Sequence, residues 1–362
     1  AMRAPYLICK GFRDAGWHVE IATFSTPENE EIDLLWDDVP VTKADGFGDG
    51  IKLLKLVAKL LRRRENHVTL SWVWYWHCFG LMLSKILFGT PYVLAMDTYT
   101  HLAPWEAKGL LSKIGLELRY GLVMRHADLI LAEWPPSYEH AKRHTQRPDV
   151  LLVPVCLWRS DLEEVEAQWA AEGYGPEREP IILYAGQIVE RKNIHHLIDA
   201  FSRLSYQFPT WRLEIRGPVS DAAYLASLQR LSNRYELDDR IEFAPGLSGE
   251  RLYRRYRSSS VYCLPSGFEG MPTTILEAMY FGGAIVAGTT GAVPYQLDHG
   301  RCGLLFESGD VEGLTHHLES LMASEIERAN YIRRARERSL DLFVWEAYFD
   351  QVEEKFRELL ER

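Results

Sequence analysis

The stretch "SVYCLPSGFEGMPTTILEAMYFGGAIVAG", residues 260–288, has the pattern that predicts in succession a strand, a tight turn, a helix and a second strand. Two glutamates lie eight positions apart in it, Glu269 just before the turn and Glu277 inside the helix. Helix N-termini attract anions, because their first N–H groups are unpaired and the peptide dipoles add up there. A carboxylate beside such a terminus indicates a ligand that carries both phosphates and hydroxyls.

The same alternation of strand and helix extends over the second half of the chain. The short apolar runs that we expect to form strands are residues 181–186, 211–217, 240–246, 260–266, 283–288 and 303–307. The helical patterns are residues 194–207, 221–235, 249–257, 273–281, 311–322 and about 325 to 362. Alternation of this kind predicts a parallel, doubly wound α/β sheet with helices on both faces.

The first half shows the same pattern less regularly. Its expected strands are residues 18–24, 67–74, 91–97, 127–133 and 149–155, and its expected helices are residues 50–64, 80–88 and about 109–126. The chain starts directly at a helix-like segment, residues 4–16, whereas a doubly wound domain usually opens with a strand. We therefore expect the first strand of this domain and the loop after it to be missing.

These patterns predict two similar Rossmann-like units in tandem. We expect the first to span residues 1–160 and the second residues 175–344, with the acidic stretch 160–180 as the linker. The last helix, about 345–362, is expected to pack back on the first unit. The ligand-binding cleft should lie between the units, at the carboxyl ends of both sheets.

Composition limits the function classes. A chain of 362 residues is too long for one ordinary core, which favours two domains. The net charge of −10 argues against a nucleic-acid partner, because a phosphate-binding surface is normally basic. The five cysteines are far apart and form no CxxC pair, so they are interpreted as buried thiols in a reducing, cytoplasmic compartment. No basic start followed by an apolar run indicates a signal peptide.

One stretch imitates a membrane span. Residues 68–96 contain a single formal charge, Lys85. The turn signal "FGTP" at 88–91 lies in the middle of this stretch, and the run after it has the length of a buried strand. A strand, a helix and a second strand are therefore favoured over a transmembrane helix.

Four strand ends that lead into glycine-containing turns should face the cleft from the second unit. Their sequences are "YAGQIVERKNIHHLIDAF" (184–201), "IRGP" (215–218), "SGFEGMPTTILEAM" (266–279) and "GTTGAVPYQLDHGRCGLLF" (288–306). At such turns the backbone can approach a phosphate closely. No G-x-G-x-x-G follows any strand, which disfavours a dinucleotide dehydrogenase.

With these motifs the second unit resembles the C-terminal domain of the retaining GT-B glycosyltransferases of family 4. That family has a G-R-x-x-x-x-K-G turn, an E-x7-E motif and a late proline- and glycine-containing stretch, which here are "GQIVERKN", "EGMPTTILE" and "VPYQLDHGRCGLLF". The resemblance covers about 180–345 well and 15–155 by strand order only. It implies a GT-B fold, two Rossmann-like domains that face a central cleft.

The resemblance also implies roles for single residues. Glu269 would hydrogen-bond the hydroxyls of the transferred sugar, Lys192 would neutralise the leaving diphosphate, and these two are the catalytic candidates. Glu277 would accept hydrogen bonds from the ribose. The other donor-binding candidates are Gly186, Gln187, Arg191, Arg216, Gly217, Gly270, Met271, Pro272, Thr273 and Thr274.

The chain departs from the family pattern at several positions. Gln187 stands where the family has arginine, so Arg191 is the cation that could replace it. Asn193 stands where the family has glycine. No Asp-x-Asp stands where a divalent metal would bind, so we expect no metal and no cofactor, with Lys192 and the helix N-terminus in place of the metal.

Four residues of the first unit are candidates for the acceptor site. They are Trp76, His77, Asp97 and His101. The first two stand at a strand end, where an aromatic ring can stack on a sugar, and the other two follow the third strand. For His101 a structural role is the other interpretation.

The sequence thus predicts a retaining glycosyltransferase that uses a nucleotide sugar, with a UDP-sugar as the expected donor. The acceptor would be a saccharide or a lipid-linked saccharide, in polysaccharide or glycoconjugate biosynthesis. A sugar-nucleotide 2-epimerase of GT-B shape and a non-catalytic nucleotide-sugar-binding protein remain alternatives. Helix 51–64 is basic and amphipathic, so it either lies on the inner face of a membrane or packs with a solvated face.

Overall fold

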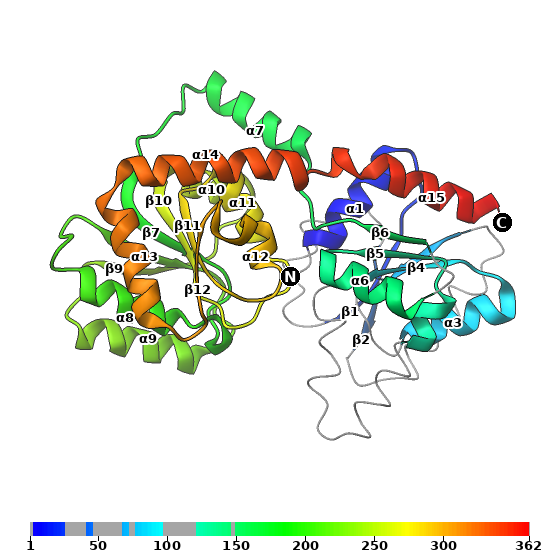
Figure 1. Ribbon diagram of the computed structural model, residues 1–362, viewed down its shortest axis with the longest axis horizontal. Helices are drawn as coiled ribbons and strands as arrows, with labels where there is room; N and C mark the ends of the chain where they lie inside the picture. The colour runs from blue at the N-terminus through cyan, green and yellow to red at the C-terminus, as the bar shows by residue number, and fades with distance from the viewer. Residues whose placement is uncertain are drawn as a thin grey trace. The chain divides into compact units, whose positions relative to one another are not determined.

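The computed structural model describes residues 3–25, 41–45, 67–71, 77–96, 121–145 and 149–361. The chain forms two compact units (Figure 1). One comprises Ala1–Cys156 with Trp345–Arg362, and the other comprises Leu157–Val344.

The first unit is built on a parallel sheet with the strand order β3-β4-β5-β6. Its strands are β3 (Thr69–Ser71), β4 (Tyr92–Met96), β5 (Leu129–Ala132) and β6 (Asp149–Leu152). A separate parallel pair consists of β1 (Ile21–Ser25) and β2 (Val41–Asp45). The sequence "VTKAD" of β2 is not an apolar run, so the sequence analysis did not predict this strand.

Helices cover both faces of the four-stranded sheet (Figure 1). On one face lie α1 (Arg3–Asp14) and α15 (Phe349–Glu361), and on the other lie α3 (His77–Phe88) and α6 (Pro135–His144). The rings of Phe12 and Phe356 pack 4.6 Å apart between centroids, so the last helix contacts the first. Trp17 adds a hydrogen bond of 2.8 Å from its indole N–H to the carboxylate of Glu353.

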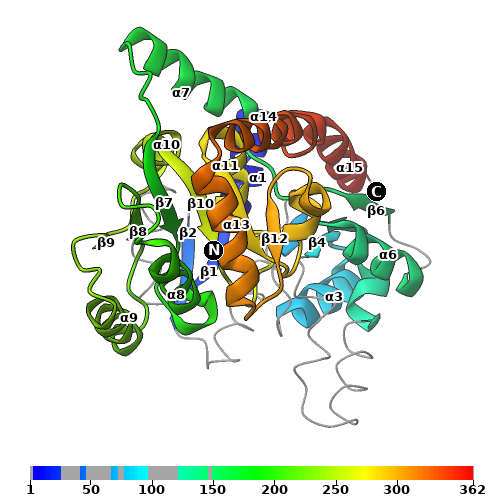
Figure 2. The ribbon, with the colours of Figure 1, turned by 60° about the vertical axis from the view of Figure 1, so that its left-hand side comes forward.

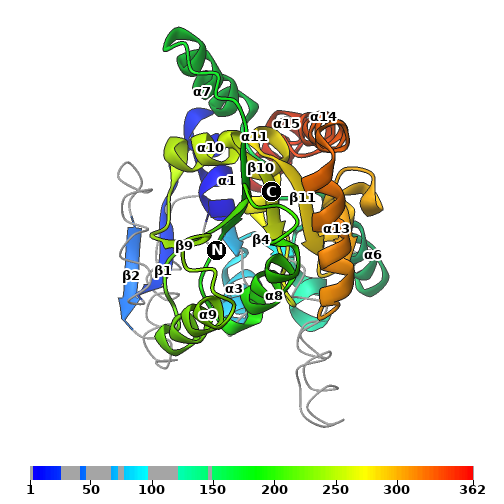
Figure 3. The ribbon, with the colours of Figure 1, turned by 90° about the vertical axis from the view of Figure 1, so that its left-hand side faces the viewer.

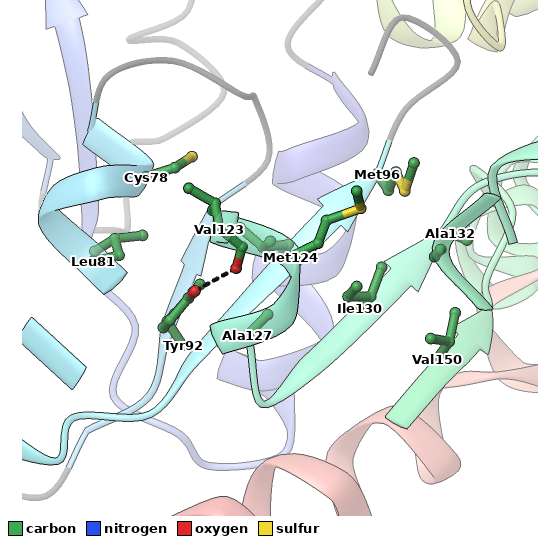
Figure 4. Close-up of a cluster of buried hydrophobic side chains, with 12 residues drawn as sticks. Cys78, Leu81, Tyr92, Met96, Val123, Met124, Ala127, Ile130, Ala132 and Val150 are labelled. Carbon is green, nitrogen blue, oxygen red and sulfur yellow. Dashed lines mark hydrogen bonds between the residues drawn. The ribbon is translucent and has the colours of Figure 1, made fainter. Parts of the chain in front are cut away.

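A buried cluster joins α3 to the sheet (Figure 4). Cys78 and Leu81 of α3 lie beside Val123, and the Tyr92 hydroxyl donates to the Val123 carbonyl at 2.6 Å. The predicted strand, helix and strand over 68–96 are therefore confirmed as β3, α3 and β4. None of the helices in the described part of the chain is long and apolar enough to cross a membrane.

The second unit is a six-stranded parallel sheet with the order β12-β11-β10-β7-β8-β9. The strands are β7 (Glu179–Ala185), β8 (Arg212–Arg216), β9 (Ile241–Ala244), β10 (Ser259–Leu264), β11 (Ala284–Gly288) and β12 (Leu304–Phe306). This is a doubly wound sheet whose strand order reverses between β7 and β10. The α/β class and the parallel sheets that the sequence predicts are confirmed.

Helices again form two layers on this sheet (Figures 2 and 3). One layer contains α8 (Ile194–Leu204), α9 (Ala222–Arg234) and α13 (Val311–Ala323), and the other contains α10 (Gly249–Ser258), α11 (Thr273–Phe281) and α14 (Glu325–Leu342). The strands β10 and β11 are buried along their whole length, as expected for strands covered on both faces. The short elements are η2 (Glu190–Lys192), α12 (Val293–Gln296), η3 (Asp298–Gly300) and η4 (Trp345–Ala347).

The stretch that the sequence analysis interprets as a linker is mostly a packed helix of the second unit, α7 (Arg159–Ala171). Trp169 is buried against Phe281 of α11, and its indole N–H donates to Glu250 at 3.0 Å. Glu166 accepts two hydrogen bonds from Arg336 of α14, at 2.9 and 2.6 Å. One carboxylate of the acidic stretch, that of Glu166, thus forms an ion pair with Arg336 of α14.

Candidate active site

The candidate site lies at the carboxyl ends of β7 and β10, where the order of the sheet reverses. Ligands of doubly wound sheets bind at this point, because the connections leave it in opposite directions. The turn after β7, residues 186–192, and the turn after β10, residues 265–272, are in contact. The N–H of Gly267 donates to the carbonyl of Arg191 at 3.1 Å. Backbone contact therefore holds together two segments that the sequence assigns to one ligand.

A buried ion pair connects these two turns. The ammonium of Lys192, at the end of η2, donates to a carboxylate oxygen of Glu269. The two residues are only 9% and 6% exposed. Burial lowers the pKa of Lys192, and the neighbouring carboxylate of Glu269 opposes that shift. The two catalytic candidates of the sequence analysis are thus partners, and an arriving phosphate would compete with Glu269 for the ammonium.

The loop after β11 fixes the turn that carries Glu269. Thr290 accepts a hydrogen bond from the Glu269 N–H at 3.3 Å, and the N–H of Ala292 donates to the carbonyl of Gly270 at 2.9 Å. Gly291 has φ +52°, and a Cβ at this position would lie 2.0 Å from the carbonyl oxygen of Glu269. Only glycine therefore allows this close approach.

The N-terminus of α11 adjoins this turn. The helix begins at Thr273, and its N-cap residue, Pro272, provides no side-chain hydrogen bond. The first N–H groups of a helix without a side-chain cap can bind an anion. The side chain of Thr274 hydrogen-bonds the buried hydroxyl of Tyr262, and Met271 is buried. At the N-terminus of α11 the backbone N–H groups are thus the donors that could bind a phosphate.

Glu277 lies one turn further along α11 and is only 1% exposed. The hydroxyl of Tyr256 on α10 donates to its carboxylate at 3.4 Å. The structure therefore places the second glutamate of the motif in the interior of the unit, against α10. Its environment differs from that of Glu269, whose partner is a cation of the neighbouring turn.

Arg216 ends β8 and is held by carboxylates. Its guanidinium donates to Glu214 and, at 3.4 Å, to Glu242. The next residue, Gly217, packs on Gly186, since a Cβ at Gly217 would lie 1.7 Å from the Gly186 carbonyl oxygen. Gly186 and Gly217 thus make a backbone-to-backbone contact between neighbouring turns.

Arg191, the cation that could replace the family arginine, contacts Gln187, which occupies the position of that arginine. The Arg191 guanidinium donates to the Gln187 side-chain oxygen at 3.1 Å and to the Phe268 carbonyl at 3.4 Å. A cation is therefore present over the turn although glutamine occupies the position of the family arginine.

Comparison with known proteins agrees with this geometry. The model of the family described as glycosyl transferases group 1 matches residues 167–338, which include every turn described above. Residues 167–338 belong to the glycosyl transferases group 1 family.

Relatives of the glycosyl transferases group 1 segment include two curated proteins. An uncharacterized glycosyltransferase of Haemophilus influenzae is 32% identical over 39% of this chain and 39% of its own length. An MMP alpha-(1->4)-mannosyltransferase of Mycolicibacterium hassiacum is 31% identical over 49% of this chain and 43% of its own length. The matched part of the chain thus spans less than half the length of these relatives.

Solved structures show the fold over nearly the whole chain. HepE of Anabaena, in complex with UDP-glucose, superposes with a TM-score of 0.75 and 15% identity, covering 98% of this chain and 95% of HepE. The chain therefore has the GT-B fold, and the fold class expected from the sequence is confirmed.

The sequence analysis did not predict one contact that stabilises this site. The hydroxyl of Tyr224 on α9 accepts hydrogen bonds from the backbone N–H of His195, at 3.2 Å, and of Ile194. It also contacts Nδ1 of His195 at 2.8 Å, and burial lowers the pKa of that imidazole. Tyr224 thus caps α8 directly after Lys192, where the N-cap residue Asn193 provides no side-chain bond. No local sequence signal reveals a cap that comes from another helix.

Several predictions fall outside the described residues. These are the acceptor candidates Trp76, Asp97 and His101 and the basic helix 51–64. His77 begins α3, but its side chain is also outside the described set. In the ranges that the structure describes, no three His, Cys, Asp or Glu side chains are grouped to hold a metal ion.

Proposed function

We propose that the chain is a retaining glycosyltransferase that transfers a sugar from a nucleotide-sugar donor, expected to be a UDP-sugar, to a saccharide or lipid-linked saccharide. The observation that carries this proposal is the buried Lys192–Glu269 pair beside the N-terminus of α11, at the switch point of the sheet. The family of residues 167–338, the mannosyltransferase relative and the UDP-glucose complex of HepE support it.

The residues of the pair have complementary tasks in this reaction. Departure of a nucleoside diphosphate builds negative charge, which the Lys192 ammonium and the first N–H groups of α11 would stabilise. Positive charge develops on the sugar at the same time, and the Glu269 carboxylate would stabilise it. Both charged side chains are already buried at the two turns before the donor arrives, and charges held in place in this way are the most effective.

The donor contacts come from the second unit. The residues that we expect to contact the donor lie on the turns that hold the Lys192–Glu269 pair and on the neighbouring strand end. They are Gly186, Gln187, Arg191, Arg216, Gly217 and residues 270–274. Glu277 would accept the ribose hydroxyls from inside α11. Because Glu277 is almost fully buried, the ribose must reach inward to it or displace the contact with Tyr256.

A transfer assay tests the proposal. The purified chain is incubated with each of a panel of nucleotide sugars, with and without saccharide acceptors, and the products are separated by mass spectrometry. Lys192→Ala should lower kcat by about 10²-fold, by comparison with loss of one oxyanion donor. Lys355→Ala is the matched control, because Lys355 also pairs with carboxylates but lies on α15, in the first unit.

The products distinguish the alternatives. Elongated acceptor confirms transfer, and the anomeric configuration of the new bond shows whether it is retained. Epimerised nucleotide sugar without elongated acceptor would identify the epimerase. Donor binding without turnover across the whole panel would identify a binding protein, and the proposal would then be wrong.

A further inference from the structure

The short helix after β11 contains a fully buried polar side chain that the proposed function does not use. Gln296 ends α12, which lies against α11, and is 0% exposed (Figure 1). Its neighbours Val293 and Leu297 are fully buried apolar side chains. Glutamine is mostly exposed in proteins, because burying its amide removes hydrogen bonds to water. A glutamine at this position therefore needs a partner inside the unit.

That partner is the N-cap residue of α11. The side-chain nitrogen Nε2 of Gln296 donates to the carbonyl oxygen of Pro272 at 3.1 Å. The same oxygen accepts a hydrogen bond from the N–H of Ile275 at 3.2 Å, within the first turn of the helix. A carbonyl oxygen has two lone pairs, and Pro272 uses both. This carbonyl is thus held from two sides, by its own helix and by Gln296.

The other end of the Gln296 amide forms no such bond. Its oxygen Oε1 is buried and has no hydrogen-bond partner among the residues that the structure describes. The orientation of the amide follows from Pro272, because a carbonyl oxygen can accept only from the Nε2 side. A buried polar atom without a partner is unfavourable and offsets the gain from the one bond that is made. The contact with Pro272 is therefore better explained by what it fixes than by added stability.

The backbone that carries Gln296 is anchored to α14 by Arg338. This guanidinium donates through Nε to the carbonyl of Gln296 at 2.9 Å and through Nη2 to the carbonyl of Tyr295 at 2.7 Å. It also lies 3.6 Å from the carboxylate of Asp298. The last carbonyls of a helix have no partner within the helix, and here a cation of α14 provides one. The side chain of Gln296 thus extends toward Pro272 from a fixed position.

We propose that Gln296 is a positioning residue, which holds the first turn of α11 in the orientation that binds the diphosphate of the donor. The carbonyl of Pro272 and the N–H of Thr273 belong to one planar peptide unit, so fixing the carbonyl also fixes the direction of the N–H. Pro272 itself has no N–H, so Thr273 and Thr274 provide the first N–H groups of this helix end. This inference rests on the proposed function, which provides the diphosphate. Gln296 acts on it only through Pro272.

Calorimetric titration with a nucleoside diphosphate and with its nucleoside, UDP and uridine being the expected pair, tests the proposal. Gln296→Met keeps the length of the side chain and removes the donor. It should lower the affinity for UDP by about five- to tenfold and that for uridine by less than about twofold, because uridine has no phosphate. Urea unfolding should give the variant a stability equal to or above that of the unmodified chain, since the unpaired Oε1 is removed as well.

Amide hydrogen exchange tests the same contact without a ligand. The N–H of Ile275 is bonded to the Pro272 carbonyl, and it should exchange about fivefold faster or more in Gln296→Met. Gln207→Met is the matched control, because Gln207 also donates through Nε2, to Glu319 at 3.1 Å, but is exposed and lies between α8 and β8. It should match the unmodified chain in both measurements.

The outcomes separate this proposal from the proposed function. Unchanged affinity for UDP in Gln296→Met, or equal losses for UDP and uridine, would refute the positioning role, and so would unchanged exchange of Ile275. If the unmodified chain binds no nucleoside diphosphate, the proposed function is wrong. The exchange rate of Ile275 then decides by itself whether Gln296 holds the end of α11.

Discussion

Replacing Glu269 by glutamine should remove the charge of the site's buried carboxylate and leave its shape nearly unchanged. In the unmodified chain this carboxylate is the partner of Lys192, and both side chains are almost fully buried. Removing one partner of a buried ion pair leaves an uncompensated charge and typically costs about 3–5 kcal/mol. We expect Glu269→Gln to destabilise the second unit by an amount of this order.

The pKa of Lys192 determines how this loss depends on pH. Burial already lowers that pKa, and Glu269 is the group that opposes the shift. Without the carboxylate the pKa should fall further. The unfolded chain then holds a proton that the folded chain binds more weakly, so the stability of the variant should rise as pH is raised toward the ordinary lysine range. Restoration at high pH would separate this effect from a packing defect.

Catalysis and binding should respond differently to the same substitution. Glu269 faces the sugar in our proposal, so glutamine should lower kcat by about 10²-fold. Free UDP should bind with nearly unchanged or higher affinity, because the Lys192 ammonium no longer has a competing carboxylate. Steady-state kinetics and calorimetric titration with UDP measure the two quantities.

A double-mutant cycle provides the control. The losses of unfolding free energy in Lys192→Met and in Glu269→Gln should together exceed the loss in the double variant. The difference, which is the coupling energy of the pair, should be about 0.5–3 kcal/mol. These stabilities are measured by urea unfolding, with amide hydrogen exchange in β7 and β10 as the signal for the second unit itself. Additive effects, or loss of UDP binding in Glu269→Gln with kcat retained, would show that the pair does not act as described.

Three further substitutions test other parts of the site. Glu277→Ala should mainly raise KM for the donor and leave kcat within a few-fold, because a ribose contact is equal in ground and transition states; a selective loss of kcat would reverse the roles of the two glutamates. Gly291→Ala should lower the free energy of unfolding by at least about 2 kcal/mol and should reduce activity, since its Cβ would clash with the Glu269 carbonyl. Gly300→Ala, also at positive φ but with open space around it, should show only the backbone strain. Tyr224→Phe should shift the pKa of His195 in an NMR titration, because it removes the hydroxyl that lies 2.8 Å from Nδ1, and should raise KM through the Lys192 turn. An unchanged titration would show that this hydrogen bond is not made.

The sequence by itself determined the local elements of the second unit. The helix predicted over 273–281 forms over Thr273–Phe281, and the apolar run 260–266 forms β10 with a shift of one or two residues at its ends. Apolar periodicity, glycine turns and Pro272 act on neighbouring residues, so their effect can be read without the rest of the chain. The same local chemistry identified the turns that contain Lys192 and Glu269.

Only the tertiary structure decided how those turns combine. Strand order places β7 beside β10, and this neighbourhood makes Lys192 and Glu269 an ion pair rather than two separate ligand contacts. It also buries Glu277 against Tyr256 and lets Tyr224 cap a helix that is distant in the chain. The acidic stretch 160–180 looked like a linker because its buried contacts, Trp169 with Phe281 among them, come from segments far along the sequence. Such contacts depend on which surfaces the fold brings together, and neither residue type nor spacing within one segment encodes that choice.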